Sequence, residues 1–237
     1  MKANISSTFK HWGNDLIGLL FPNFCNACGI PLFKNEKIIC TKCLYDLPFT
    51  DYHIHPENRV AKQLWGRLPL NAAMAMLYFR KGAKVQNLIH SLKYNSKTDV
   101  GIYLGNLLGE RLKNSPLYND VDLIVPVPLH HKKLRLRGYN QSSYIAEGIA
   151  EKMDVLFDES TLIRAISTES QTKKSRYNRY ENMKSVFKTN KVQSIIGKHI
   201  LLVDDVITTG ATLEACANVL IESGATKVSI AALAFAE

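Results

Sequence analysis

The sequence of 237 residues is long enough for one large domain, or for a medium-sized domain with a small one beside it. Hydrophobic residues make up 46% and charged residues 22%, which is typical of a folded globular protein and excludes a largely disordered chain. The apolar runs are far shorter than the ~20 residues that cross a bilayer, and polar residues interrupt the N-terminus. We therefore expect a cytoplasmic protein without a membrane span or a secretory signal.

The net charge of +9 is concentrated in two segments of the chain. Residues 130–137 and 164–191 together carry twelve Lys and Arg against two acidic residues, and the rest of the chain is nearly neutral. Two such basic segments indicate a polyanionic partner, with solvated loop charge as the alternative.

The first predicted element is an N-terminal helix. Its apolar residues recur at helical spacing and are Phe9, Trp12, Leu16, Leu19 and Leu20. We expect this helix to pack on its neighbour rather than to lie on a membrane surface.

Four cysteines follow in the pattern C-x2-C-x11-C-x2-C: Cys25, Cys28, Cys40 and Cys43. Each C-x-x-C pair can present two thiolates to one ion, and four thiolates complete a closed tetrahedral shell around Zn²⁺. The pattern predicts a small zinc-ribbon-like module with a structural metal, and two disulfides are the alternative. We place this module with the N-terminal helix and a linker in residues 1–62, and a second domain in residues 63–237.

From residue 70 onwards, strand and helix patterns alternate. Strands are predicted at 72–79, 121–128, 162–165, 185–188, 197–205 and 226–237, and helices at 83–94, 100–113, 139–153 and 211–224. This alternation predicts a doubly wound α/β fold with a mostly parallel sheet, whose ligand crevice lies at the carboxyl ends of the strands. The strands ending near residues 127, 165 and 204 should open onto one crevice, and the two basic segments follow the first two.

The third of these strands ends in Asp204 and Asp205 and is followed by a small-residue turn at the start of a helix. Free backbone N–H groups and the helix dipole at such a junction suit a phosphate monoester. The two acids can accept hydrogen bonds from the vicinal hydroxyls of a sugar. Together they predict a cradle for a ribose 5-phosphate.

The stretch "LLVDDVITTGATL", residues 201–213, resembles the 5-phosphoribosyl 1-pyrophosphate (PRPP) signature of type I phosphoribosyltransferases over its whole length. Three further stretches are similar to the ComF-type competence proteins of that superfamily. They are the H-x-x-K-Y of "LIHSLKY", the R-G-[FY]-N-Q of "LRLRGYNQ", and a Q-x7-R-x2-N-x4-F pattern formed by Gln171, Arg179, Asn182 and Phe187. The four-cysteine module resembles theirs as well, so the resemblance covers nearly the whole chain.

The resemblance implies a type I phosphoribosyltransferase fold and a role for each motif. Asp204 and Asp205 would hold the ribose hydroxyls, and Arg179, in a hood formed by residues 166–184, would contact pyrophosphate. The remaining PRPP-binding residues would be Thr208, Thr209, Gly210, Ala211 and Thr212 at the 5-phosphate, with Arg135, Arg137 and Gly138 near the pyrophosphate. Mg²⁺ would bridge pyrophosphate and ribose oxygens.

Two functions remain open at this stage. One is a PRPP-binding protein of DNA uptake, with competence proteins and single-stranded DNA as partners, for which Tyr177 and Tyr180 could stack on bases. The other is an active phosphoribosyltransferase whose base or amine acceptor the sequence does not indicate. A PRPP-synthetase-like protein is a weaker alternative, because no ATP site is visible. Nothing in the sequence indicates an oligomeric state.

Overall fold

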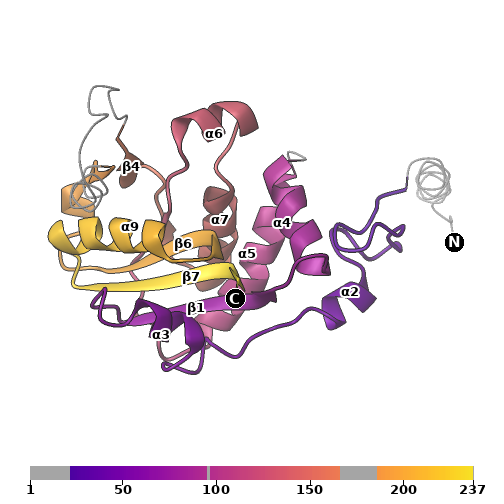
Figure 1. Ribbon diagram of the computed structural model, residues 1–237, viewed down its shortest axis with the longest axis horizontal. Coiled ribbons are helices and arrows are strands. Elements are labelled where there is room, and N and C mark those ends of the chain that lie inside the picture. The colour runs from indigo at the N-terminus through magenta and orange to yellow at the C-terminus, as the bar shows by residue number, and fades with distance from the viewer. Residues whose placement is uncertain (1–21, 95–96, 166–185, 237) are drawn as a thin grey trace, which may run out of the picture.

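The computed structural model describes residues 22–94, 97–165 and 186–236. Its centre is a five-stranded sheet in the order β1-β7-β6-β2-β3, and all neighbouring strands are parallel (Figure 1). The strands are β1 (Ala72–Phe79), β2 (Leu123–Pro126), β3 (Leu156–Phe157), β6 (His199–Ile207) and β7 (Lys227–Ala236). The prediction of a mostly parallel α/β fold is confirmed.

The central strands are apolar along most of their length, because helices cover the sheet on both faces. In β7 every residue from Val228 to Phe235 is buried, and in β6 the same holds from His199 to Val203. The first partly exposed side chains of β6 are Asp204 and Asp205. The continuous buried run of β6 therefore ends where its acidic residues begin.

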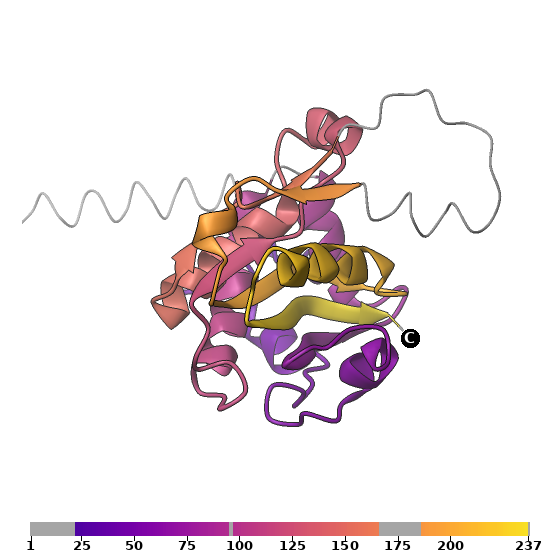
Figure 2. The same cartoon turned by 90° about the vertical axis from the view of Figure 1, so that its left-hand side faces the viewer.

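Four long helices connect these strands: α4 (Lys84–Tyr94), α5 (Thr98–Lys113), α7 (Gln141–Met153) and α9 (Ala211–Glu222). The connections through α5 and α7 run along the sheet in one direction, and the connection through α9 runs in the other. Because crossovers between parallel strands are right-handed, α9 lies on the face opposite to α5 and α7. In Figure 2, α9 (gold) lies alongside β6 and β7.

Helices α5 and α7 approach each other at glycines. A Cβ atom on Gly105 would overlap the carbonyl oxygen of Ile145, and one on Gly148 would overlap the carbonyl oxygen of Ile102. At Gly109 a Cβ would come within 2.9 Å of the Ile149 Cα. The two backbones are therefore in direct contact, and α7 is fixed close to the sheet that it covers.

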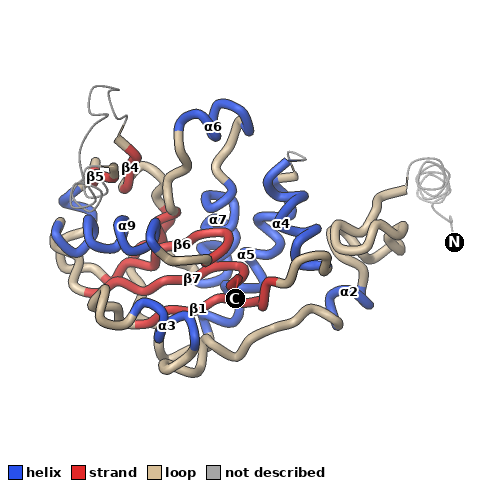
Figure 3. Tube along the Cα trace, in the orientation of Figure 1, coloured by secondary structure: helices blue, strands red, loops and turns tan. Residues whose placement is uncertain are grey.

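The segment between the cysteines and β1, predicted as a linker, is instead packed against the sheet. The amide of Thr50 donates to the Met76 carbonyl at 2.9 Å, and the amide of Tyr78 donates to the Pro48 carbonyl at 3.0 Å. In Figure 3 this loop runs beside β1 and leads into α3 (Arg59–Leu64). Helix α3 spans the predicted boundary at residue 62, and the division into two domains stays a prediction.

Two further differences concern short elements. The pattern missed α2 (Thr41–Tyr45), α6 (His131–Arg137) and the single 3₁₀ turn η1 (Val192–Ser194), since each is too short to show a clear periodicity. The predicted strand at 162–165 is β4 (Leu162–Arg164), but it pairs antiparallel with β5 (Phe187–Thr189) outside the main sheet. The expectation that β4 opens onto the crevice as a strand of the parallel sheet was therefore wrong.

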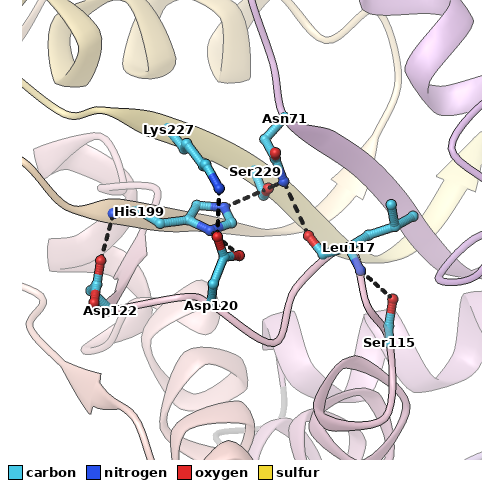
Figure 4. Close-up of polar contacts among 8 residues, drawn as sticks. All are labelled: Asn71, Ser115, Leu117, Asp120, Asp122, His199, Lys227 and Ser229. Atoms are coloured by element: carbon cyan, nitrogen blue, oxygen red, sulfur yellow. Dashed lines mark hydrogen bonds and ion pairs between the residues drawn. The ribbon is translucent and has the colours of Figure 1, made fainter.

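A polar network joins the amino-terminal ends of β6 and β7, at the end of the sheet opposite to Asp204. The buried His199 ring contacts Asp120 Oδ1 at 2.7 Å and Ser229 Oγ at 2.8 Å, and Lys227 Nζ donates to Asp120 Oδ2 at 2.6 Å (Figure 4). Asn71, which precedes β1, donates to the same Ser229 hydroxyl at 3.2 Å. Because Ser229 is fully buried, these contacts have a structural role: they fix the register of three neighbouring strands.

In the part of the chain that the structure describes, no helix has the length and apolar character that crossing a bilayer requires.

Candidate functional site

Asp204 and Asp205 lie at the carboxyl end of β6, and each has a different partner. Asp204 Oδ1 accepts hydrogen bonds from the Ser142 hydroxyl of α7 at 3.0 Å and from the Asp205 amide at 2.8 Å. Asp205 Oδ2 forms an ion pair with Lys93 Nζ of α4 at 2.7 Å. Two acids adjacent in sequence are thus held from two different helices.

The pKa of Asp204 is raised from its ordinary value to about 7, first because burial disfavours the charged form and second because Asp205 is a like charge. The Asp205 amide, the Ser142 hydroxyl and Lys93 act in the opposite direction. An ionised Asp204 therefore reduces the stability of the free protein. Such a cost is typical of a binding residue whose favourable partner arrives with a ligand.

We expect Asp204→Asn to stabilise the free protein at pH 8. The folded pKa of Asp204 lies above the unfolded value of about 3.9, so its contribution to stability falls as the pH rises from about 4 to about 7. Asparagine avoids this loss and keeps an oxygen that accepts from Ser142. A gain of about 1 kcal/mol or more would raise the Tm by about 2–4 °C.

Thermal unfolding of both proteins at pH 4 and pH 8 measures this effect. The difference should be absent at pH 4. Asp205→Asn is the comparison: it removes the same repulsion between the two acids, but it also removes the ion pair with Lys93 and leaves Asp204 buried, so its gain should be smaller. A lower Tm for Asp204→Asn at pH 8 would contradict the prediction.

The loop of residues 208–212 surrounds a hollow of about 50 Å³ between the end of β6 and the start of α9. Asp204 and the first residues of α9 line the same hollow. A water molecule takes about 30 Å³ in the liquid, so the hollow has the size of a small ion rather than of a whole nucleotide. The predicted 5-phosphate residues and Asp204 are therefore brought together.

Helix α3 and the turn after it donate hydrogen bonds to the backbone of this loop. Gln63 Nε2 donates to the Thr208 carbonyl at 2.6 Å, and Arg67 donates to the Thr209 carbonyl at 3.0 Å and pairs with Glu214. Gly210 has a φ of +73°, and a Cβ there would come within 2.7 Å of the Leu64 side chain. The position thus requires glycine for its backbone conformation, and any larger residue there would also displace the end of the Leu64 side chain.

The first basic segment forms α6, which has no buried residue. Arg135 is exposed on it, while Arg137 donates to Gln141 Oε1 at 2.7 Å and lies 5.4 Å from the centre of the Tyr94 ring. Gly138 ends the helix in the left-handed conformation and lines a larger cavity of about 820 Å³ between α6, α7 and β4. No lining residue is shared with the hollow at 208–212. Of the three predicted pyrophosphate residues, Gly138 lines this cavity and none lines the hollow at 208–212.

Arg179, Tyr177 and Tyr180 lie outside the described residues, as do the whole predicted hood of residues 166–184 and the predicted N-terminal helix. Their predicted roles stay predictions.

Several residues at the site were not assigned a role by the sequence. They are Gln63, Arg67, Lys93 and Ser142. Lys93 belongs to the H-x-x-K-Y motif, which could have drawn attention to it, whereas Gln63 and Arg67 lie between the predicted linker and the first predicted strand, where no element was predicted. No motif in the sequence around Gln63 and Arg67 indicates a role at the site.

The four cysteines form one cluster beside α4. Their sulfur atoms all lie within 4.8 Å of one another, and Cys28 Sγ and Cys40 Sγ are 3.9 Å apart. Four sulfurs at the usual Zn–S distance of about 2.3 Å are separated by about 3.8 Å, whereas a disulfide needs about 2.05 Å. All four cysteines are free thiols, so the residues fit a single metal ion and not two disulfides.

Backbone amides direct the electrostatics of this cluster. Cys25 Sγ accepts from the Cys40 amide at 3.3 Å, and Cys40 Sγ accepts from the Cys43 amide at 3.4 Å. Burial on its own would raise the pKa of Cys25, but amides of Cys40, Cys28 and Ala27 outweigh it and lower the pKa to about 7. Burial raises the pKa of Cys43, so full ionisation of the cluster depends on a cation.

Comparison with known proteins agrees with these features. Residues 140–237 match the family model described as the phosphoribosyl transferase domain. The "DNA utilization protein YhgH" of Escherichia coli (strain K12) is 28% identical over 93% of this chain and 89% of its own length. "Competence protein F" of Haemophilus influenzae is 28% identical over 62% of this chain and 66% of its own. "Competence protein ComFC" of Bacillus subtilis (strain 168) is 36% identical over 46% of this chain and 43% of its own.

Proposed function

We propose that this chain, which is a ComF-type member of the phosphoribosyltransferase superfamily, binds PRPP at the carboxyl end of β6 and acts in the handling of DNA. The observation that carries the proposal is the position of the acid pair. Asp204 and Asp205 follow the buried run of β6 near its carboxyl end, and Asp204 lines the hollow that the loop of residues 208–212 surrounds. This arrangement suits a sugar with vicinal hydroxyls on one side and a phosphate on the other.

In the proposed complex, the carboxylates accept hydrogen bonds from the ribose hydroxyls, and the loop with the N-terminal end of α9 holds the 5-phosphate. The exposed cations of α6 and Arg179 in the hood would attract the pyrophosphate. Mg²⁺ would enter with PRPP and neutralise charge through the ligand's own oxygens, which are the hard donors it prefers.

The test is calorimetric titration of the purified protein with PRPP and Mg²⁺. We expect Asp204→Asn combined with Asp205→Asn to weaken binding at least about 100-fold. Each substitution replaces a charged carboxylate, which only accepts hydrogen bonds, by a neutral amide that also carries a donor. The loss of two charge-assisted hydrogen bonds at about 1.5–3 kcal/mol each gives this order. Asp120→Asn is a matched control, since Asp120 contacts His199 at the amino-terminal end of β6, away from Asp204. Binding that the double variant retains in full would contradict the proposal.

The relatives named for DNA utilization and competence support a role in DNA uptake, with single-stranded DNA and competence proteins as partners. An active phosphoribosyltransferase is the second candidate, favoured by the matching domain model. Release of pyrophosphate in the presence of a base or amine acceptor supports the enzyme. Salt-sensitive single-strand binding without such release supports the DNA-handling protein.

For the cysteine cluster we propose structural zinc. Four sulfur donors leave no ligand position for a reacting water, and soft thiolates are the ligands that favour Zn²⁺ over hard cations. Free, metal-binding thiols are typical of a reducing compartment, which supports a cytoplasmic protein.

A further inference from the structure

Lys93 stands out among the described cations because it contacts the acid pair directly. Its ammonium group lies 2.7 Å from Asp205 Oδ2, and its side chain keeps 24% of its exposure while that of Asp205 keeps 15%. The contact is thus largely shielded from water but keeps part of its surface exposed.

Helix α4, which carries Lys93 in its last turn, is held at two places along its length. Toward α7, the Tyr139 hydroxyl donates to the Leu92 carbonyl at 2.5 Å, and Arg137 lies over the ring of Tyr94. On the other side, Asn87 Nδ2 donates to the Ala27 carbonyl in the four-cysteine segment at 2.8 Å. These contacts fix the position of Lys93 relative to β6, so its ion pair is not a chance meeting of two long side chains.

The groups facing the Asp204 carboxylate come from four elements. Asp205 comes from β6 itself, the Lys93 ammonium from α4, the Ser142 hydroxyl from α7 and the Cys216 thiol from α9. Only one of these groups is a cation. Without it, the two adjacent carboxylates would face each other with hydrogen-bond donors alone, and protonation of one of them would be the easiest relief.

We propose that Lys93 is a substrate-positioning residue, which holds the Asp205 carboxylate in place and favours the ionised form of Asp204, so that both acids accept hydrogen bonds from ribose hydroxyls. The proposal rests on the proposed PRPP site and adds a residue to it. A protonated carboxyl presents a donor where a sugar hydroxyl needs an acceptor, so loss of Lys93 weakens binding most at low pH.

The experiment compares three variants with the wild-type protein in titrations with PRPP and Mg²⁺ between pH 6 and pH 9. Lys93→Met is expected to bind about tenfold more weakly at pH 7, and Lys93→Arg to stay within about threefold of the wild type, because arginine keeps the charge. Lys84→Met is the matched control. It lies on the same helix and removes a lysine–aspartate ion pair of 2.8 Å, but that pair joins α4 to Asp46 and not to the acids.

The pH profile separates a positioning role from a structural one. Wild-type affinity should rise as the pH increases through about 7, where Asp204 ionises. In Lys93→Met this rise should move to higher pH, so that the deficit shrinks at pH 9. A deficit that does not change with pH, or that Lys84→Met reproduces, overturns the proposal. Wild-type protein that fails to bind PRPP at any pH refutes the proposed function itself, which distinguishes the two failures.

Discussion

Replacing Cys25 by serine is expected to abolish stoichiometric zinc binding and to unfold the four-cysteine segment, while the parallel sheet stays folded. Structural zinc in such small sites contributes on the order of 10–16 kcal/mol of apparent binding free energy, and the metal-free site rarely keeps its fold. Apart from the cysteines, the segment buries only a few small or aliphatic side chains, among them Ile38 and Ile39. Phe24, Ile30 and Phe33 are exposed, and its regular elements are a single bridge and a five-residue helix.

The measurements are the zinc content of the purified protein by mass spectrometry and the susceptibility of residues 22–46 to proteolysis. Cys216→Ala is the matched control: it removes the fifth thiol, which is buried on α9 and belongs to no cluster in the described part of the chain. This control should keep its zinc. A Cys25→Ser protein that retains one zinc per chain would refute the metal site.

Thiol titration under denaturing, non-reducing conditions checks the alternative of two disulfides. Five free thiols per chain are expected once the metal is released, because all five cysteines are free. A single free thiol would indicate disulfides instead.

The sequence predicted the long elements well because their patterns are strong. Strand β1 was expected at residues 72–79 and lies there, and the strand ending in Asp204 and Asp205 was placed within two residues of its observed ends. A buried parallel strand is a run of apolar residues, and this signal is local to the chain. The stretch that resembles the PRPP signature is local as well, which is why the sequence could predict that Asp204 lies near residues 208–212.

The sequence could not predict the contacts that join distant segments. Lys93 contacts Asp205 across more than a hundred residues, and Gln63 donates to the Thr208 carbonyl from a part of the chain where no element was predicted. Such pairs depend on how α3 and α4 pack on the sheet, and the sequence around a single residue does not indicate this packing. The same holds for β4, whose apolar residues suit either a parallel or an antiparallel partner.

Gly105→Val is expected to destabilise the protein by on the order of 4 kcal/mol, more than the usual ~1–3 kcal/mol for an overpacked core. At this position a Cβ would overlap the backbone carbonyl of Ile145, and a backbone atom cannot rotate away as a side chain can. Helix α7 would have to move as a body. Because α7 carries Ser142, which donates to Asp204, the displacement should also weaken PRPP binding.

The free energy of unfolding by urea measures the first effect, and Glu110→Val is the matched control. Glu110 is an exposed residue of the same helix, so this variant introduces valine without a packing clash, and helix propensity alone costs it about 0.5 kcal/mol. Propensity would even favour valine over glycine at position 105. A large loss of stability at position 105 alone must therefore come from the contact between α5 and α7. If both variants unfold at the same urea concentration, the close approach of the two helices does not hold the fold together.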